Sequence, residues 1–160
     1  MITEQQATEE VSILAERMAM LYYEFVVKLI EELGEERTEE IVSRVIADYG
    51  VACGKIARAA VINAGERPVL ACHHLSHELP RFGWDMESEL RLDGKEKTSR
   101  VTICPFAEAW KERGFERWGR MYCHIDQAKM AAYNEKIGAA HDKNMLDGDD
   151  CCIIRVWEND

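Results

Sequence analysis

The sequence lacks a surplus of basic residues. Its 160 residues include 20 Lys and Arg against 30 Asp and Glu, a formal net charge of -10, and most of that charge falls in the first 50 residues. Such a surface repels phosphate backbones and anionic lipids. We therefore expect neither a nucleic acid nor a membrane as partner.

Long apolar runs and an export signal are also missing. The N-terminal residues 1–5 contain no basic segment followed by an apolar one, and no stretch reaches the roughly 18 uncharged apolar residues of a membrane span. We expect a cytoplasmic protein. In a reducing cytosol its six cysteines should be free thiols or metal ligands and not disulfides.

Internal repeats and low-complexity linkers are absent as well, and the length suits one compact domain with an adequate core. We expect a single domain over residues 1–160. Its N-terminal helical part should cover about residues 3–65, and a cysteine-containing α+β part should cover about residues 66–157.

Apolar residues recur every three or four positions from Val11 to Leu33. This spacing predicts one long amphipathic helix, for which Thr3 and Gln6 can form a capping box. Gly34 should end the helix.

A second amphipathic pattern runs from Thr38, a candidate N-cap, to about Ala60 and stops at residues 63–65. Gly50 and Gly54 each weaken a helix interior by about 1 kcal/mol relative to alanine. A close helix crossing at residues 52–54 would explain them. The wide apolar stripes of the two helices also make a homodimer an expected assembly.

From Trp84 to Leu92 the pattern alternates between apolar and charged residues, and residues 98–104 return after a turn at 93–94. This predicts an antiparallel hairpin. Before it, residues 67–79 fit a short helix better than a short strand, on the spacing of their apolar residues.

Cys104 is expected to end the second strand of the hairpin. Strand alternation places Val101 and Ile103 on one face and Cys104 on the other. Pro105 suits the first position of a following helix, which Gly114 should end.

A further helix is expected from about Glu116 to Tyr133, with Cys123 and Asp126 on one face because they are three residues apart. Residues 151–157 then predict a terminal strand. The expected fold class is α+β, with long N-terminal amphipathic helices packed on a small antiparallel sheet and further helices inserted between its strands.

Paired zinc-ligand motifs such as Cys-x-x-Cys are missing. Cys104, Cys123 and Cys152 lie on different elements that short loops can bring together, and they can be core thiols, reactive thiols or metal ligands. His73 and His77, with His74 between them, could chelate a metal on a helix, but the Glu of His-Glu-x-x-His is lacking. A polar helix face is the simpler reading.

One ordered pattern spans residues 100–157: Cys-Pro-Phe-Ala-Glu, then Tyr-Cys-x-x-Asp, an Asn, and Gly-Asp-x-x-Cys entering an apolar strand. It resembles the L-2-amino-thiazoline-4-carboxylic acid hydrolase family, and its last part is similar to the end of 4-vinyl reductase domains. The residues that carry the resemblance are Cys104, Pro105, Cys123, Asp126, Asn134, Gly148, Asp149 and Cys152.

The resemblance implies hydrolytic opening of a cyclic amidine. Water adds to the thiazoline carbon that carries the amino group, and the ring bond to sulfur breaks. Such a reaction needs an activated nucleophile, a proton for the leaving group and an anchor for the substrate carboxylate.

Cys104 is a candidate nucleophile, because a helix N-terminus lowers a thiol pKa. Asp126 can act as the base or orient His124, although positions 124 and 126 diverge on a helix. Arg120 and Lys129 are candidate carboxylate anchors.

The resulting hypothesis assigns catalytic roles to four residues and substrate binding to three. The catalytic candidates are Cys104, Cys123, Asp126 and Cys152, and the substrate-binding candidates are Asn134, Asp149 and Arg120. In the alternative, Cys104, Cys123 and Cys152 bind zinc or another divalent metal, or the chain is a non-catalytic domain of 4-vinyl reductase type that binds a small molecule or a metal. Four tryptophans are candidates for the walls of a pocket or for the core: Trp84, Trp110, Trp118 and Trp157.

Overall fold

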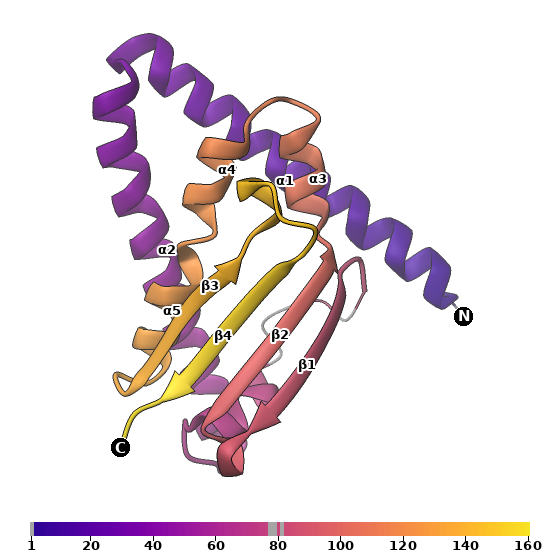
Figure 1. Cartoon of the computed structure of the whole chain (residues 1–160), viewed down its shortest axis with the longest axis vertical. Helices are drawn as coiled ribbons and strands as arrows, with labels where there is room; N and C mark the ends of the chain where they lie inside the picture. The colour runs from indigo at the N-terminus through magenta and orange to yellow at the C-terminus, as the bar shows by residue number, and fades with distance from the viewer. Residues whose placement is uncertain (1, 77–79, 81) are drawn as a thin grey trace.

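Two long helices lie against a four-stranded sheet in the computed structural model, which describes residues 2–76, 80 and 82–160 (Figure 1). The long helices are α1 (Glu4–Leu33) and α2 (Glu35–Asn63). The shorter helices are α3 (Pro105–Lys111), α4 (Glu116–Tyr122) and α5 (Ile125–Tyr133). The strands are β1 (Asp85–Arg91), β2 (Glu96–Ile103), β3 (Ile137–Lys143) and β4 (Cys152–Glu158). The 3₁₀ segments are η1 (Leu70–Ser76), η2 (Leu92–Gly94) and η3 (Met145–Asp147).

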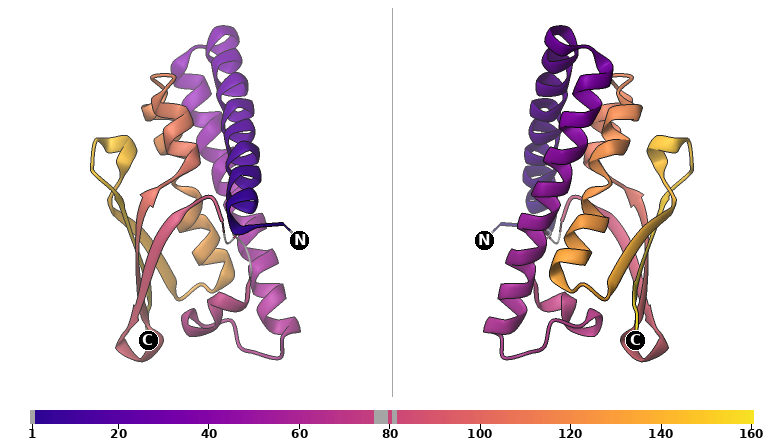
Figure 2. Two further views of the ribbon diagram at one scale, coloured as in Figure 1. Left: turned by 90° about the vertical axis from the view of Figure 1, so that its right-hand side faces the viewer. Right: turned by 90° about the vertical axis from the view of Figure 1, so that its left-hand side faces the viewer.

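The strand order is β1-β2-β4-β3, and every neighbouring pair is antiparallel. Helices α3 to α5 enter the chain between β2 and β3. Figure 2 shows the sheet on one side of the molecule, α1 and α2 on the other, and the shorter helices between them. The predicted α+β class, with long N-terminal helices on a small antiparallel sheet, is confirmed. Among the described residues, no helix is both long and apolar enough to cross a membrane.

Helix α1 begins as predicted, with a capping box in which the Thr3 side chain and the Gln6 side chain each bond the other's backbone N–H. It ends at Gly34, whose φ of +78° favours glycine. The predicted N-cap of the second helix was wrong. Helix α2 starts at Glu35, and Thr38 is buried in its first turn, where its hydroxyl donates to the Gly34 carbonyl at 2.8 Å.

The predicted close crossing at Gly50 and Gly54 is confirmed, and its partner is α5. A Cβ atom on Gly54 would lie 2.2 Å from the Lys129 carbonyl oxygen, and one on Gly50 would lie 2.7 Å from the Ala128 Cβ. The two glycines let the backbones of α2 and α5 approach closely. This contact sets the position of α5.

The prediction of one helix over residues 116–133 was wrong, because the helix breaks at Cys123 and His124. Around the break the backbone bonds link residues three apart: His124 N–H donates to Met121 O at 3.1 Å and Asp126 N–H to Cys123 O at 3.4 Å. This tighter turn separates α4 from α5. Cys123 thus follows the last residue of α4, and Asp126 lies in the first turn of α5.

Strand β3 was not predicted, since Gly138, Ala139 and Ala140 have little β-propensity. The glycine has a packing role instead. A Cβ at position 138 would lie 2.5 Å from the Trp157 ring, so only glycine lets this indole lie flat against β3. As a result, the terminal strand β4 is central to the sheet and not at its edge.

Cys104 lies on the same side of the sheet as Val101, contrary to the prediction. The register of β1 and β2 shifts between the pairs Met86–Val101 and Asp85–Ile103, so Thr102 is an extra residue. Such a β-bulge reverses the alternation that follows it. Ile103 therefore faces solvent, 45% exposed, and Cys104 turns inward. As predicted, α3 begins with Pro105 directly after it.

The segment predicted as a short helix contains the 3₁₀ helix η1, and residues 77–79 of that prediction lie outside the described residues. Its buried Leu70 belongs to a core shared by α2, α5, β3 and β4, whereas a second core of Trp110, Phe115 and Trp118 lies beneath α1. Between these two cores the inner face of the sheet is hollowed by a pocket.

Candidate functional site

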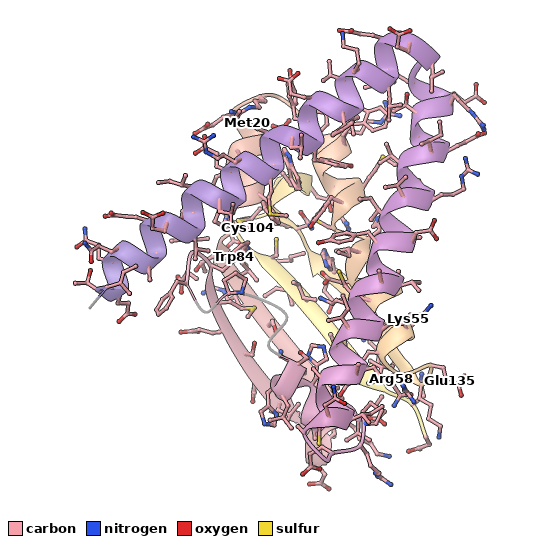
Figure 3. All side chains as sticks on the ribbon, turned by 180° about the vertical axis from the view of Figure 1, so that it is seen from behind. Met20, Lys55, Arg58, Trp84, Cys104 and Glu135 are labelled. Atoms are coloured by element: carbon pink, nitrogen blue, oxygen red, sulfur yellow. The ribbon has the colours of Figure 1, made fainter. Side chains whose placement is uncertain are left out.

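A pocket of about 420 Å³ lies between the inner face of the sheet and the helices. Its walls are mainly apolar and come from α2, β2, α3, α5 and β4. Aromatic side chains line it, namely Tyr49, Trp84, Phe106, Trp110 and Tyr122. Figure 3 shows Trp84 and Cys104 close together beneath α1. A concave, largely apolar cavity with a few polar groups is the usual form of a small-molecule site.

All four residues predicted to be catalytic line this pocket: Cys104, Cys123, Asp126 and Cys152. They arrive from the end of β2, the α4–α5 break, the first turn of α5 and the start of β4. The structure therefore brings together residues that are up to 48 positions apart in the sequence. Their chemical roles stay predictions.

The three residues predicted to bind substrate do not line it. Asn134 follows α5 and makes local contacts, since its amide donates to Pro68 O and its carbonyl accepts from Lys136 N–H. It borders a separate hollow with Arg58 and Glu135, far from Cys104 in Figure 3.

Asp149 and Arg120 lie outside the pocket and form hydrogen bonds to the segment between β3 and β4. The Asp149 carboxylate accepts a 2.8 Å hydrogen bond from the backbone N–H of Asn144, which itself lines the pocket. Arg120 Nε donates to Asp147 at 2.8 Å. Both residues hold the turn that connects β3 to β4.

The Cys104 thiol sits at the start of α3. Burial raises the pKa of this thiol above its ordinary value, while hydrogen bonds from the backbone N–H groups of Ala107 and Phe106 oppose the shift. Those amides would stabilise a thiolate once it forms. Burial therefore favours the protonated thiol of Cys104, whereas the two backbone N–H groups favour the thiolate that a nucleophile needs.

The other two thiols are also buried. Burial raises the pKa of Cys123 to about 12, so this group stays protonated at neutral pH. Burial raises the pKa of Cys152 as well, and its sulfur, like that of Cys104, accepts from a backbone N–H, that of Met145 at 3.4 Å. Cys123 is therefore better suited to donate a proton than to attack a substrate.

A buried ionic group forms the polar end of the pocket. Asp126 accepts from Lys129 Nζ at 2.9 Å and from His141 Nε2 at 2.9 Å. The three side chains are only 20%, 12% and 3% exposed, respectively. Burial acts to raise the pKa of Asp126, but the Lys129 charge and the His141 hydrogen bond outweigh it and hold that pKa well below its usual value. Asp126 is consequently an anion and a weak base.

His141 was not among the residues predicted from the sequence. Its hydrogen bond with Asn144 determines which ring nitrogen carries the hydrogen. The Asn144 side-chain oxygen accepts from Leu146 N–H at 2.9 Å, so its NH₂ group faces His141 Nδ1, also at 2.9 Å. An amide NH₂ group can only donate. Nδ1 must accept, and the ring proton sits on Nε2, directed at Asp126. The structure thus pairs Asp126 with His141 and not with His124, which does not line the pocket.

The signal that would have revealed His141 is the alternation of Ile137, Ala139 and His141 on the inner face of β3. It was hidden by the small residues between them. Lys129, by contrast, was considered as an anchor beside Arg120, and it is Lys129 that lines the pocket.

The alternative prediction of a metal site finds no suitable group of ligands among the described residues. In residues 2–76, 80 and 82–160, no group of three or more His, Cys, Asp or Glu side chains is arranged to hold a metal ion. Of the proposed histidine site, His73 packs edge-on against Tyr133 with ring centres 4.9 Å apart, and His74 Nδ1 lies 2.9 Å from Ala71 O. His77 lies outside the described residues.

The four tryptophans divide between the two roles considered. Trp84 and Trp110 line the pocket, and Trp118 is in the core. Trp157 lies on the outer face of the sheet against Gly138, with Arg155 over its ring at 4.9 Å.

The chain thus combines an α+β fold with an apolar pocket that is lined by thiols and a buried ion pair. The family model for L-2-amino-thiazoline-4-carboxylic acid hydrolase matches residues 14–156, and the chain belongs to this family. Membership supports a hydrolase-like role at the level of the family. No curated protein matches the chain.

Two solved structures share the fold at low identity. A trafficking protein particle complex subunit 3 from Naegleria fowleri, covalently bound to palmitic acid, has a TM-score of 0.56 and 15% identity, over 92% of this chain and 96% of that one. The phenol-responsive sensory domain of the transcription activator PoxR, with phenol, has a TM-score of 0.51 and 13% identity, over 90% of this chain and 74% of that one. These similarities concern the fold alone.

Proposed function

We propose that the pocket is the active site of a hydrolase that opens a cyclic amidine bearing a carboxylate, a substrate like the thiazoline for which the family is named. One observation carries the proposal. Cys104, with backbone amides at its sulfur, shares an apolar cavity with the Asp126–Lys129 ion pair in a chain of this family.

In the proposed reaction the Cys104 thiolate attacks the amidine carbon, and the ring bond from that carbon to sulfur breaks. The ring sulfur leaves as a thiol after gaining a proton. Water then attacks the same carbon, which releases the Cys104 thiol and an N-carbamoyl amino acid. The net change is the addition of one water to the substrate.

The remaining polar groups have separate tasks in this scheme. Lys129 is a cation in the lining of a mainly apolar pocket, and in this scheme it binds the substrate carboxylate. Asp126 holds Lys129 in place, since its carboxylate accepts a hydrogen bond from Lys129 Nζ at 2.9 Å. The Cys123 thiol, protonated at neutral pH because burial raises its pKa to about 12, can donate the proton to the leaving sulfur.

The test follows the appearance of a free thiol on ring opening, with L-2-amino-thiazoline-4-carboxylate as the probe and a chromogenic thiol reagent for detection. Cys104→Ser should abolish turnover, whereas Cys72→Ser, outside the pocket, should not. The metal content of both proteins is measured in parallel. Metal that is present in the wild type and lost in Cys104→Ser would favour ligation, and an active Cys104→Ser protein would contradict the nucleophile.

A second candidate is a non-catalytic domain that binds an apolar small molecule. The observation in its favour is the wall of Trp84, Phe106 and Trp110, which is larger than a thiazoline ring needs. The fold neighbours hold palmitic acid and phenol. Quenching or enhancement of the pocket tryptophan fluorescence by either compound, without turnover of the thiazoline, would favour this candidate.

A further inference from the structure

Helices α1 and α2 each expose a row of large apolar side chains. On α1 the row recurs at intervals of three and four residues, and on α2 at intervals of four and seven. These side chains are between 41% and 69% exposed. We call them the α1–α2 apolar face; its members are Leu14, Met18, Leu21, Phe25, Val45, Tyr49 and Ile56.

Aromatic rings connect α1 to α2. Tyr22, one turn from Met18 and Phe25, contacts Tyr122 with ring centres 5.6 Å apart, and Tyr122 contacts Tyr49 of α2 at 6.3 Å. This chain of rings bridges α1 and α2. Figure 3 shows the two helices diverging from their junction.

The size of the face exceeds what a monomer usually exposes. Large apolar side chains present roughly 150–250 Å² each, so seven at these exposures leave on the order of 700 Å². The largest apolar patch of a typical monomer is about 300–600 Å². A standard interface buries roughly 800 Å² per partner. The α1–α2 apolar face is therefore of the size that a stable dimer needs.

Charge favours a second copy of the same chain as the partner. Helix α1 carries seven Glu against Arg17 and Lys28. Residues 43–63 of α2 carry Arg44, Lys55 and Arg58 against Asp48. An acidic helix from one copy is attracted to the basic half of α2 in another, whereas anionic lipid and nucleic acid are repelled by α1.

We propose that two copies of this chain associate through the α1–α2 apolar face, with α1 of each copy packed against α2 of the other. The contact is isologous, so one surface serves both copies. Tyr49 and Ile56 belong both to this face and to the pocket lining. The second copy therefore closes the side of the pocket that these residues border, and the site is complete only in the dimer.

Sedimentation velocity of the full chain tests the association. The molar mass obtained for the wild type should be twice the 18.4 kDa of one chain. Leu21→Glu, at a position 60% exposed in one copy, should give a monomer, because a charge would be buried at the contact. Leu92→Glu, 70% exposed in the hairpin turn far from α1, is the matched control and should stay dimeric.

Closure of the pocket has its own readout. Cys53 lines the pocket on the exposed side of α2, and its alkylation by iodoacetamide, scaled to that of Cys72 by mass spectrometry, should be several-fold faster in Leu21→Glu than in the wild type. Circular dichroism verifies folding, and Phe25→Glu replaces Leu21→Glu if that variant unfolds. A monomeric wild type at micromolar concentration, a dimer that persists in both variants, or equal Cys53 alkylation would overturn the proposal.

Discussion

The Asp126 carboxylate and the His141 imidazole come from α5 and β3 and meet at 2.9 Å beside the pocket. Lys129 completes the group from one turn further along α5. Because all three side chains are mostly buried, the arrangement depends on Asp126 remaining charged. This one carboxylate connects the stability of the fold to the charge of the proposed substrate anchor.

Asp126 should make the folded state sensitive to acid. Its pKa is held below the usual value of 3.8 by Lys129 and His141 despite burial, so its contribution is fully present above that pH and is lost as the pH falls. Asp126→Asn should lower the free energy of unfolding at pH 7 by about 2 kcal/mol. It should also flatten the loss of stability below about pH 4. Urea unfolding at a series of pH values measures both effects, with the exposed Asp48→Asn as a control that should retain the wild-type profile.

Thiazoline turnover should rise with pH through the alkaline range if Cys104 is the nucleophile. Burial raises the pKa of its thiol, so the reactive thiolate is scarce at neutral pH and increases as the pH rises toward that raised pKa. The same profile should govern inactivation by iodoacetamide when labelling of Cys104 is followed by mass spectrometry. A rate that falls across this range would point to water as the attacking group.

Replacing Lys129 should separate the two cations considered as carboxylate anchors. Lys129→Met should raise KM for the thiazoline carboxylate about 10- to 100-fold, as expected for a lost ionic contact of about 1.4–2.8 kcal/mol, with a smaller change in kcat. Lys129→Arg should restore part of the loss by keeping the charge. Arg120→Met tests the other cation, which pairs with Asp147 outside the pocket, and should leave KM near the wild-type value. The opposite ranking would return the anchor to Arg120.

The convergence of Cys104, Cys123, Asp126 and Cys152 could be predicted because each depends on a short-range signal. Pro105 marks the strand-to-helix junction, and positions 123 and 126 share a face on either side of the break because both its residues keep helical dihedrals. The Gly148 turn, with φ of +95°, precedes Cys152. These local signals therefore place the four residues correctly, even though the helix predicted over residues 116–133 is broken at Cys123 and His124.

Long-range register decided what the sequence could not show. Cys104 faces inward only because Thr102 is an extra residue in the pairing of β2 with β1, and a bulge has no signature in the alternation. His141 reaches Asp126 only because residues 137–143 form a strand, β3, that pairs with β4 and carries the imidazole onto the inner face of the sheet. The exposure of Leu21 and Phe25 likewise depends on how far α1 diverges from α2, which a helical periodicity does not contain.

Gly54 should prove essential to the position of α5 and hence of Lys129. A methyl group at residue 54 would meet the Lys129 carbonyl oxygen at 2.2 Å and the Ala132 Cβ at 2.8 Å, and backbone atoms cannot rotate away. Gly54→Ala gains about 1 kcal/mol of helix propensity but should suffer overpacking of about 1–3 kcal/mol or more. We expect a net loss of about 2 kcal/mol in urea unfolding and a raised KM for the thiazoline carboxylate, since α5 must shift with Lys129 on it. Ala59→Ser adds one atom at an exposed position of the same helix and should change neither quantity, whereas an equally stable Gly54→Ala protein would contradict the close crossing.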